Sequence, residues 1–270
     1  EASTGKLQDN WTGQSFSDFY ISKTDPKGAW LIPVLLESSN VINTGANEGN
    51  PMVNSKFNQL YFTRCGNEKG TLQGCQILVS RRTGRTYGEP RALPLGGDST
   101  TVFGNPSISP DELTLFFSSD LKGGQGGKDL WMATRKSPND NFAKPQNLGN
   151  VVNTPGDEMF PFMRNDTTLY FASNGHPGMG GLDIFKTTYS NGEWTKPVNL
   201  QSPMNSAGDD FGLVYHPEEE RGFFSSNRKG GKGSDDIYSF VNPPLIFTLA
   251  GTVKDDKTLQ FIQAAVIKLV

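Results

Sequence analysis

The chain has 270 residues with 34% hydrophobic residues and a formal net charge of −3, so it is long enough to bury a core. A nucleic-acid surface needs a basic stripe, and the sequence contains no run of Lys and Arg that would form one. No stretch approaches the ~20 apolar residues of a membrane-spanning helix. The 31 glycines and 17 prolines predict many tight turns between short strands and little helix.

The first predicted elements are a loop and two strands. Residues 1–16 are polar and lack periodicity, which indicates a loop, whereas Asp18 opens an apolar strand that ends near Ile21. A second strand is expected between Trp30 and Leu36. The sequence begins at Glu1 without a Met or an apolar leader, so we expect an internal fragment.

A unit of four parts then recurs along the chain. It starts at a landmark residue, which is a proline in three copies spaced by 55 residues and a glycine in the fourth: Pro51, Pro106, Pro161 and Gly212. An apolar strand such as Leu169-Tyr170-Phe171 follows, and then a Gly-rich loop and a second strand that an Asp opens in most copies. The last part has an aromatic residue three places before a proline: Trp30, Tyr87, Phe142 and Trp194. Such a period indicates an array of supersecondary units.

Each unit predicts four antiparallel strands, and four-stranded sheets repeated radially make a β-propeller. The proline of the last strand suits an edge position, where no ladder N–H is needed. We therefore expect an all-β, five-bladed β-propeller over residues 17–242, with inner strands that begin near the landmark residues. A sixth blade upstream stays open, and a linear solenoid is the alternative, although neither end shows the capping repeat that a solenoid needs.

The first and last blades are expected to be incomplete. Residues 17–36 supply the last two strands of the first blade, and residues 212–240 supply the first three strands of the last. Each of these blades has its own Asp-opened strand, so neither can simply complete the other. We expect the missing inner strands to come from polypeptide upstream of Glu1.

The repeated patterns P-x-x-x-x-D/N…L-Y-F-x-S-N, G-x-G-G-x-D-I-F and W-x-K-P-x-N-L resemble the WD40-like, TolB-related repeat called PD40. Over residues 17–240 the chain is similar to the propeller of OmpA-family envelope proteins, of which the PorE-type components of the type IX secretion system are examples. Residues 243–270 are similar to the opening strands of a carboxypeptidase-regulatory-like β-sandwich domain, through G-x-V-x-D…A-x-V-x-L. The helical-repeat and peptidoglycan-binding domains of that family lie outside this sequence.

One acidic residue opens the second hairpin strand of most blades: Asp18, Asp129, Asp183 and Asp236. A cation-ligand role beside the Gly-rich loops is one interpretation. The simpler interpretation, which we favour, is that each carboxylate accepts backbone N–H groups and fixes its turn. The glycine run of residues 123–127 is expected to be a hairpin loop, because no Gly-Lys-Ser/Thr closes it as a phosphate-binding loop requires.

Cys65 and Cys75 flank one predicted hairpin loop, and the ends of such a loop lie close together. We expect a disulfide, which fits an oxidising compartment, over two free thiols in a cytosolic protein. A zinc site would need further ligands nearby, and the two histidines, His176 and His216, belong to other blades. No metal and no cofactor are expected.

Acidic residues also recur three places before the landmark residue, where the chain crosses from one blade to the next. They are Glu48, Glu158 and Asp209, and Phe103 holds the matching place in the remaining blade. These crossings surround one mouth of the channel, so the acids are candidates for a partial ring; hydrogen bonding to their own loops, alongside Asn43, Asn153 and Asn205, is the alternative. The candidate binding residues at this mouth are Glu48, Phe103, Asn153, Asp157, Glu158, Asp209 and Asp210.

The sequence contains no convincing catalytic motif, so we expect a protein that is not an enzyme. The resemblance implies a periplasmic, outer-membrane-associated scaffold that binds other cell-envelope proteins of a secretion or gliding apparatus. Peptidoglycan would be bound only through a domain outside this sequence, and neither nucleic acid nor a direct membrane span is expected. The alternatives are a glycan-binding or glycan-cleaving propeller, which needs two facing carboxylates, and a purely structural spacer.

Overall fold

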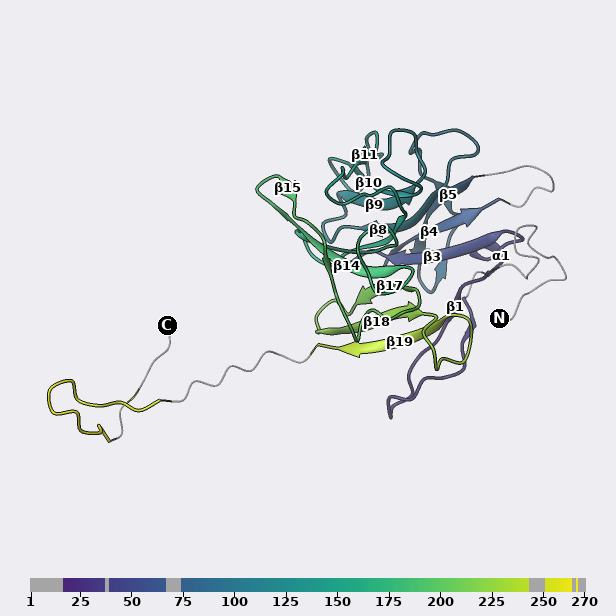
Figure 1. Cartoon of the computed structure of the whole chain (residues 1–270). Helices are drawn as coiled ribbons and strands as arrows, with labels where there is room; N and C mark the ends of the chain where they lie inside the picture. Colours follow the sequence, from purple (N-terminus) through teal and green to yellow (C-terminus); the bar gives the residue numbers. More distant parts are fainter. Residues whose placement is uncertain (1–16, 37–38, 67–73, 243–250, 264–265, 267–270) are drawn as a thin grey trace.

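The computed structural model describes residues 17–36, 39–66, 74–242, 251–263 and 266 (Figure 1). In these residues the protein is all-β apart from one helical turn, α1 (Ser39–Ile42), which confirms the expected fold class. None of the described helical residues forms a segment long and apolar enough to cross a membrane.

The described residues form five antiparallel sheets, which follow one another along the chain. The first has two strands, β1 (Tyr20–Ile21) and β2 (Val34–Leu35). The second contains β3 (Asn47–Val53), β4 (Gln59–Cys65), β5 (Cys75–Thr83), β6 (Thr86–Tyr87) and β7 (Arg91–Ala92). The third contains β8 (Phe103–Ile108), β9 (Thr114–Ser119), β10 (Asp129–Thr134) and β11 (Gln146–Asn147).

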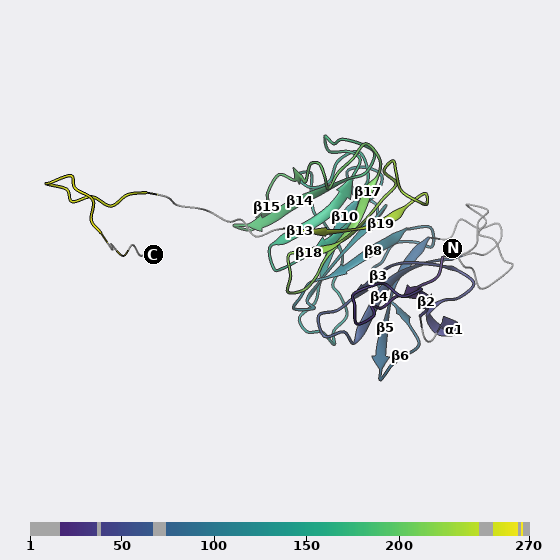
Figure 2. The ribbon, with the colours of Figure 1, turned by 90° about the horizontal axis from the view of Figure 1, so that it is seen from below.

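The fourth sheet contains β12 (Glu158–Met163), β13 (Thr168–Ser173), β14 (Asp183–Ser190), β15 (Glu193–Trp194) and β16 (Val198–Asn199). The fifth has three strands, β17 (Asp210–Tyr215), β18 (Arg221–Ser226) and β19 (Asp236–Val241). The first strands of successive sheets pack on one another, and the views show a propeller-like arrangement with β6 and β15 at the periphery (Figures 1 and 2). Counting the two-stranded sheet as a blade gives five blades.

The landmark residues lie inside the inner strands and do not begin them, which corrects the expected boundaries. Each inner strand contains a β-bulge, seen for example as a register shift between Met159 and Phe162. One residue of each bulge has a positive φ: Asn50 (56°), Asn105 (52°), Phe160 (53°) and Gly212 (63°). Gly212 is therefore the counterpart of Phe160, one place before the proline, and Leu213 takes the place of Pro161.

The predicted fourth strand is shorter than expected. In the second and fourth sheets the chain forms one short strand before the proline and another after it, as in β15 and β16 around Pro197. Proline removes a ladder N–H, so it divides the strand at this position. Within residues 251–263 the structure has only an isolated bridge, Lys254–Phe261, so the β-sandwich over residues 243–270 stays a prediction, and residues 243–250 lie outside the described part.

Apolar side chains fill the space between neighbouring sheets. A cluster around Tyr61 and Phe117 joins the second and third sheets, and one around Phe116 and Phe171 joins the third and fourth. Trp194 of the fourth sheet lies 6.0 Å, ring centre to ring centre, from Phe116 of the third. Trp30 of the first sheet lies 5.9 Å, ring centre to ring centre, from Phe223 of the fifth. Trp30 holds the repeat position of Trp194, and Phe223 holds that of Phe116. The first sheet thus neighbours the fifth as the fourth neighbours the third, which brings the array round into a ring.

Candidate interaction face

The crossing loops pack against the Gly-rich hairpin loops of the preceding sheet. Gly127 N–H donates to Gly156 O at 2.9 Å, and Gly181 N–H donates to Gly208 O at 3.2 Å. A Cβ on the nearby Gly126 would lie 2.3 Å from a carbonyl oxygen of the crossing loop, so only glycine permits this approach. The predicted hairpin loop at residues 123–127 is thereby confirmed, and its glycines serve contact between blades.

The Glu158 carboxylate is buried and bonded to its surroundings. It accepts hydrogen bonds from Thr154 N–H at 2.8 Å, from Thr154 Oγ1 at 2.6 Å and from Ser173 Oγ at 2.7 Å. The residue has no exposed surface. Glu158 therefore holds its crossing loop to strand β13, which is the alternative of hydrogen bonding to its own loop. It does not present a carboxylate to a ligand in the channel.

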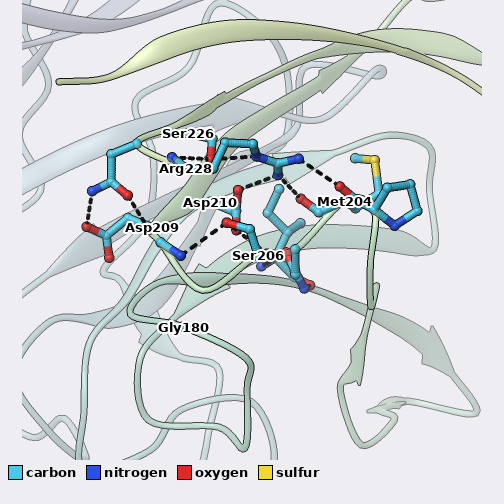
Figure 3. Close-up of polar contacts among 12 residues, drawn as sticks. Gly180, Met204, Ser206, Asp209, Asp210, Ser226 and Arg228 are labelled. Carbon is cyan, nitrogen blue, oxygen red and sulfur yellow. Dashed lines mark hydrogen bonds and ion pairs between the residues drawn. The ribbon is translucent and has the colours of Figure 1, made fainter. Parts of the chain in front are cut away.

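Glu48 and Asp210 have the same role with an arginine partner. Glu48 accepts from Thr44 Oγ1 at 2.6 Å and from Arg64 Nε at 2.8 Å. Burial raises the pKa of Glu48, although the bonds from Thr44 and the Arg64 charge act in the opposite direction. Asp210 accepts from Ser206 N–H and from Arg228 Nη2, both at 2.6 Å (Figure 3).

Register identifies Asp210, not Asp209, as the counterpart of Glu158. Glu158 pairs with Ser173, and Asp210 pairs with Ser226 at the same position of the next sheet. Asp209 corresponds instead to Asp157, and both are half-buried. Asp157 Oδ1 accepts Lys128 N–H, and Asp209 Oδ1 accepts Leu182 N–H, each at 2.8 Å, so these two acids join neighbouring blades.

The crossing-loop asparagines also join neighbouring blades. Asn153 Oδ1 accepts Leu130 N–H at 2.8 Å, and its Nδ2 donates to Leu130 O at 3.0 Å. Asn205 makes the same pair of bonds with Ile184, at 2.8 and 2.9 Å. Asn43 makes them with Phe19, at 2.8 and 3.1 Å. We call this repeated two-bond contact the asparagine staple.

The strand-opening aspartates close their own hairpin loops. Asp129 accepts the N–H groups of Gln125 and Gly126, and Asp183 accepts those of Met179 and Gly180. Asp236 accepts Lys232 N–H at 2.6 Å and Gly233 N–H at 3.2 Å. Asp18 holds the same repeat position in the first sheet. In the part of the chain that the structure describes, no three His, Cys, Asp or Glu side chains are grouped to hold a metal ion.

The second sheet closes its hairpin loop covalently. The predicted disulfide is confirmed, with a Cys65–Cys75 bond of 2.01 Å across the ends of the loop. The next crossing loop also departs from the repeat, since Phe103, which is buried, replaces the acid. Asp98 holds the place of Asn153 there, and its carboxylate accepts from Thr100 Oγ1 at 2.7 Å.

Sequence reasoning missed three side chains that bind crossing-loop carbonyls. Arg228 donates to Pro203 O at 2.9 Å and to Met204 O at 2.7 Å (Figure 3). Arg64 donates to Ile42 O at 2.8 Å. His176 Nε2 lies 2.7 Å from Val152 O. His176 stands three places after Ser173 and Arg228 two places after Ser226, so the available signal was a basic side chain shortly after the last serine of the strand.

The bulges of the inner strands surround an apolar cavity of about 330 Å³ in the channel. Its lining includes Pro51, Pro106, Pro161, Phe160 and Phe211, and the two phenylalanine rings lie 4.8 Å apart. Asn50 and Asn105 add polar groups to this wall. The accessible part of the face therefore consists of apolar channel wall and glycine-rich loops, with the acids directed into the frame.

No family model matches the sequence, and a search of curated proteins finds no match. Solved structures do resemble it. TolB from Acinetobacter baumannii has a TM-score of 0.47 at 12% identity, over 82% of this chain and 45% of that chain. An exo-β-1,3-galactanase from Clostridium thermocellum has a TM-score of 0.47 at 13% identity, over 88% of this chain and 62% of that chain.

A protein of unknown function from Dyadobacter fermentans has a TM-score of 0.50 at 12% identity, over 87% of this chain and 66% of that chain. The shared feature is the fold alone. The chain spans about half of the length of the TolB protein that it resembles.

Proposed function

We propose that this propeller is a non-enzymatic protein-interaction scaffold of the cell envelope. One observation carries the proposal: the buried mouth acids Glu48, Glu158 and Asp210 are each bonded within the frame. Catalysis by a facing pair of carboxylates would need exposed oxygens with a pocket between them. What is left on the accessible face is loops on a rigid frame, where recognition tends to occur.

The proposed compartment is the periplasm. The Cys65–Cys75 disulfide supports it, because such bonds persist in oxidising compartments. The PD40-type repeat patterns support it independently, through their resemblance to OmpA-family envelope proteins. On this proposal the partners are proteins of a type IX-like secretion or gliding apparatus at the outer membrane, and a domain outside this sequence binds peptidoglycan.

The test is a pull-down from envelope extracts with the purified chain and two loop variants. Met179 is 46% exposed in a hairpin loop of the mouth, and Lys229 is exposed in the next one. The substitutions Met179→Asp and Lys229→Glu should each remove the captured partner, because each places a negative charge on an exposed side chain of the mouth loops.

The matched control is Asp166→Lys, in the exposed turn between β12 and β13. An antiparallel hairpin places this turn at the end of the strands opposite to the mouth loops. The control should keep the partner. Capture that all three variants retain, or that the control alone loses, would contradict a mouth-loop interface.

A further inference from the structure

A groove of about 590 Å³ lies between the first sheet and the hairpin of β5 and β6, which is at the periphery of the second sheet (Figure 2). Alternate residues of the segment around β2 line one wall, namely Ile32, Val34 and Leu36. Successive side chains of a strand point to opposite faces, so this wall is a single face of the first sheet. Arg82 and Tyr87 line the other wall, and they pair across β5 and β6.

The apolar wall is exposed, and the repeat does not require it. Leu31, Ile32 and Val34, which all line the groove, are 52%, 87% and 60% exposed. Ile32 stands two places after the aromatic residue of its unit, and the other units have charged residues at that place: Glu89, Lys144 and Lys196. The frame of a blade thus needs no apolar side chain there. Exposed apolar side chains that gather in one hollow indicate a binding surface.

Three cations line the same groove. Lys23 follows β1, and Arg82 and Arg85 belong to the hairpin of the second sheet. All three are exposed, and none forms an ion pair within the part of the chain that the structure describes. No acidic side chain occurs in the described lining. In the fourth sheet the register places Tyr189 and Gly192 at the positions of Arg82 and Arg85, so the repeat does not require these arginines either.

The side chains of the groove define the class of ligand. A hydrocarbon chain would cover the apolar wall, and an anionic group beside it would pair with the cations. A peptide would bring main-chain N–H groups, each of which needs an acceptor once it is buried. The Tyr87 hydroxyl is the only side-chain acceptor in the described lining. The groove therefore favours an apolar, anionic ligand without N–H donors.

We propose that this groove binds a single acyl chain with a carboxylate head group, a ligand of the fatty-acid class. The chain lies along Ile32, Val34 and Leu36, and the carboxylate binds Arg82 and Arg85. The planar guanidinium groups suit a carboxylate, because each can donate two parallel hydrogen bonds. The groove is separate from the mouth loops, so this proposal does not depend on the protein partner proposed above.

Titration calorimetry of the full chain with dodecanoate, below its micelle concentration, tests the groove. Binding is expected. Each CH₂ group added between decanoate and tetradecanoate should tighten it, by up to about fourfold. Dodecyltrimethylammonium has the same chain length and the opposite charge, and it should bind at least about tenfold more weakly, because it cannot pair with the arginines.

Two substitutions and two matched controls locate the site. Ile32→Glu and Arg82→Glu should each weaken dodecanoate binding about tenfold or more. Both side chains are exposed, and Glu89 already holds the place of Ile32 in the second sheet, so the fold should persist. The controls are Lys196→Glu, at the place of Ile32 in the fourth sheet, and Arg81→Glu, which is exposed next to Arg82 and does not line the groove. Both controls should bind dodecanoate as the parent protein does.

Four outcomes would overturn the proposal. The first is no binding of dodecanoate, including the case in which the chain binds only vesicles of phosphatidylglycerol, since a membrane surface would then be the occupant. The second is equal binding of the anionic and cationic amphiphiles, since the cations would then play no part. The third is equal affinity of the groove variants and their controls. The fourth is a dimer, seen by light scattering, that Ile32→Glu dissociates, since a second copy would then cover the groove.

Discussion

The hairpin loops of the second and fourth sheets are closed at their base by two different kinds of bond. In the fourth sheet the Asp183 carboxylate accepts two loop N–H groups, and Ser173 and Asp183 pair across the loop base at a sequence separation of 10. In the second sheet the matching pair is Arg64 and Gln76, at a separation of 12, and the Cys65–Cys75 bond closes the loop. A carboxylate closes the shorter glycine-rich loop, and the longer loop, which has Gln76 in place of the aspartate, is closed by a covalent bond.

The two sheets are expected to respond to different conditions, because their loops are closed by different bonds. An aspartate closure depends on hydrogen bonds from loop N–H groups to a buried carboxylate, and loss of the carboxylate removes these bonds. A disulfide stabilises mainly by restricting the unfolded chain, and reduction removes it. The second sheet is therefore expected to be sensitive to reductant, and the fourth to substitution of one carboxylate.

The largest effect is expected for Asp183→Ala. Asp183 has no exposed surface, and the substitution removes two charge-assisted bonds to loop amides. The free energy of unfolding, measured with urea, should fall by about 3 kcal/mol. Asp166→Ala, at an exposed turn of the same sheet, should change it by at most about 0.5 kcal/mol. Equal effects of the two substitutions would show that the aspartate closure does not stabilise the blade.

Removal of the disulfide should have the next largest effect. The double substitution Cys65→Ser and Cys75→Ser should lower the free energy of unfolding by about 2–3 kcal/mol on the chain-entropy model. Reductant should reproduce this loss in the parent protein and leave the double variant unchanged. The Asp183→Ala loss should be the same with and without reductant, because the two sites lie in different sheets; strong coupling between them would argue against separate closures.

Glu48 provides a smaller, pH-dependent effect in the second sheet. Burial raises its pKa in the folded protein above the ordinary value of 4.5, so the folded state binds the proton more tightly than the unfolded state. The contribution of Glu48 to stability is thus full below the ordinary pKa and is lost as the pH rises through the folded pKa. Urea unfolding from about pH 4 to about pH 7 should show this decline, and Glu48→Gln should abolish it. A parallel pH profile in the variant would contradict the assignment.

The smallest effect concerns Asp98, which takes the place of a staple asparagine. Hydrogen bonds from Thr100, and a further one from Thr101, lower the pKa of this exposed carboxyl from 3.8 to about 2. Any stability that it contributes is present above the unfolded pKa and is lost as the pH falls through about 2. Carboxyl-carbon NMR should give this midpoint, and Thr100→Val should move it toward 3.8. An ordinary midpoint in the parent protein would exclude these bonds in solution.

The repeat made the sheets and the disulfide predictable, because strand patterns and loop ends are visible in a sequence. The boundaries within the inner strands were not, because a bulge adds a residue that periodicity alone does not show. That is why Gly212 was aligned with the prolines and Asp209 with Glu158. The sequence also could not predict that the mouth acids are buried, since an acidic residue at this position can face either the channel or its own crossing loop. The partners Arg64 and Arg228 come from different repeat positions, so no single pattern marks them.

The asparagine staple has a consequence for how such arrays evolve and fail. Asn43, Asn153 and Asn205 bind the Asp-opened strands through main-chain atoms of Phe19, Leu130 and Ile184, so this contact accepts a strand of almost any side-chain sequence. A whole repeat can therefore be duplicated or deleted in the gene without redesign of this junction contact. The same lack of side-chain specificity can cause errors during folding, because a crossing loop can bind the wrong strand, as in the misassembly and domain swapping of repeat proteins. The short connection between adjacent blades favours the correct partner, as does the apolar packing between neighbouring sheets.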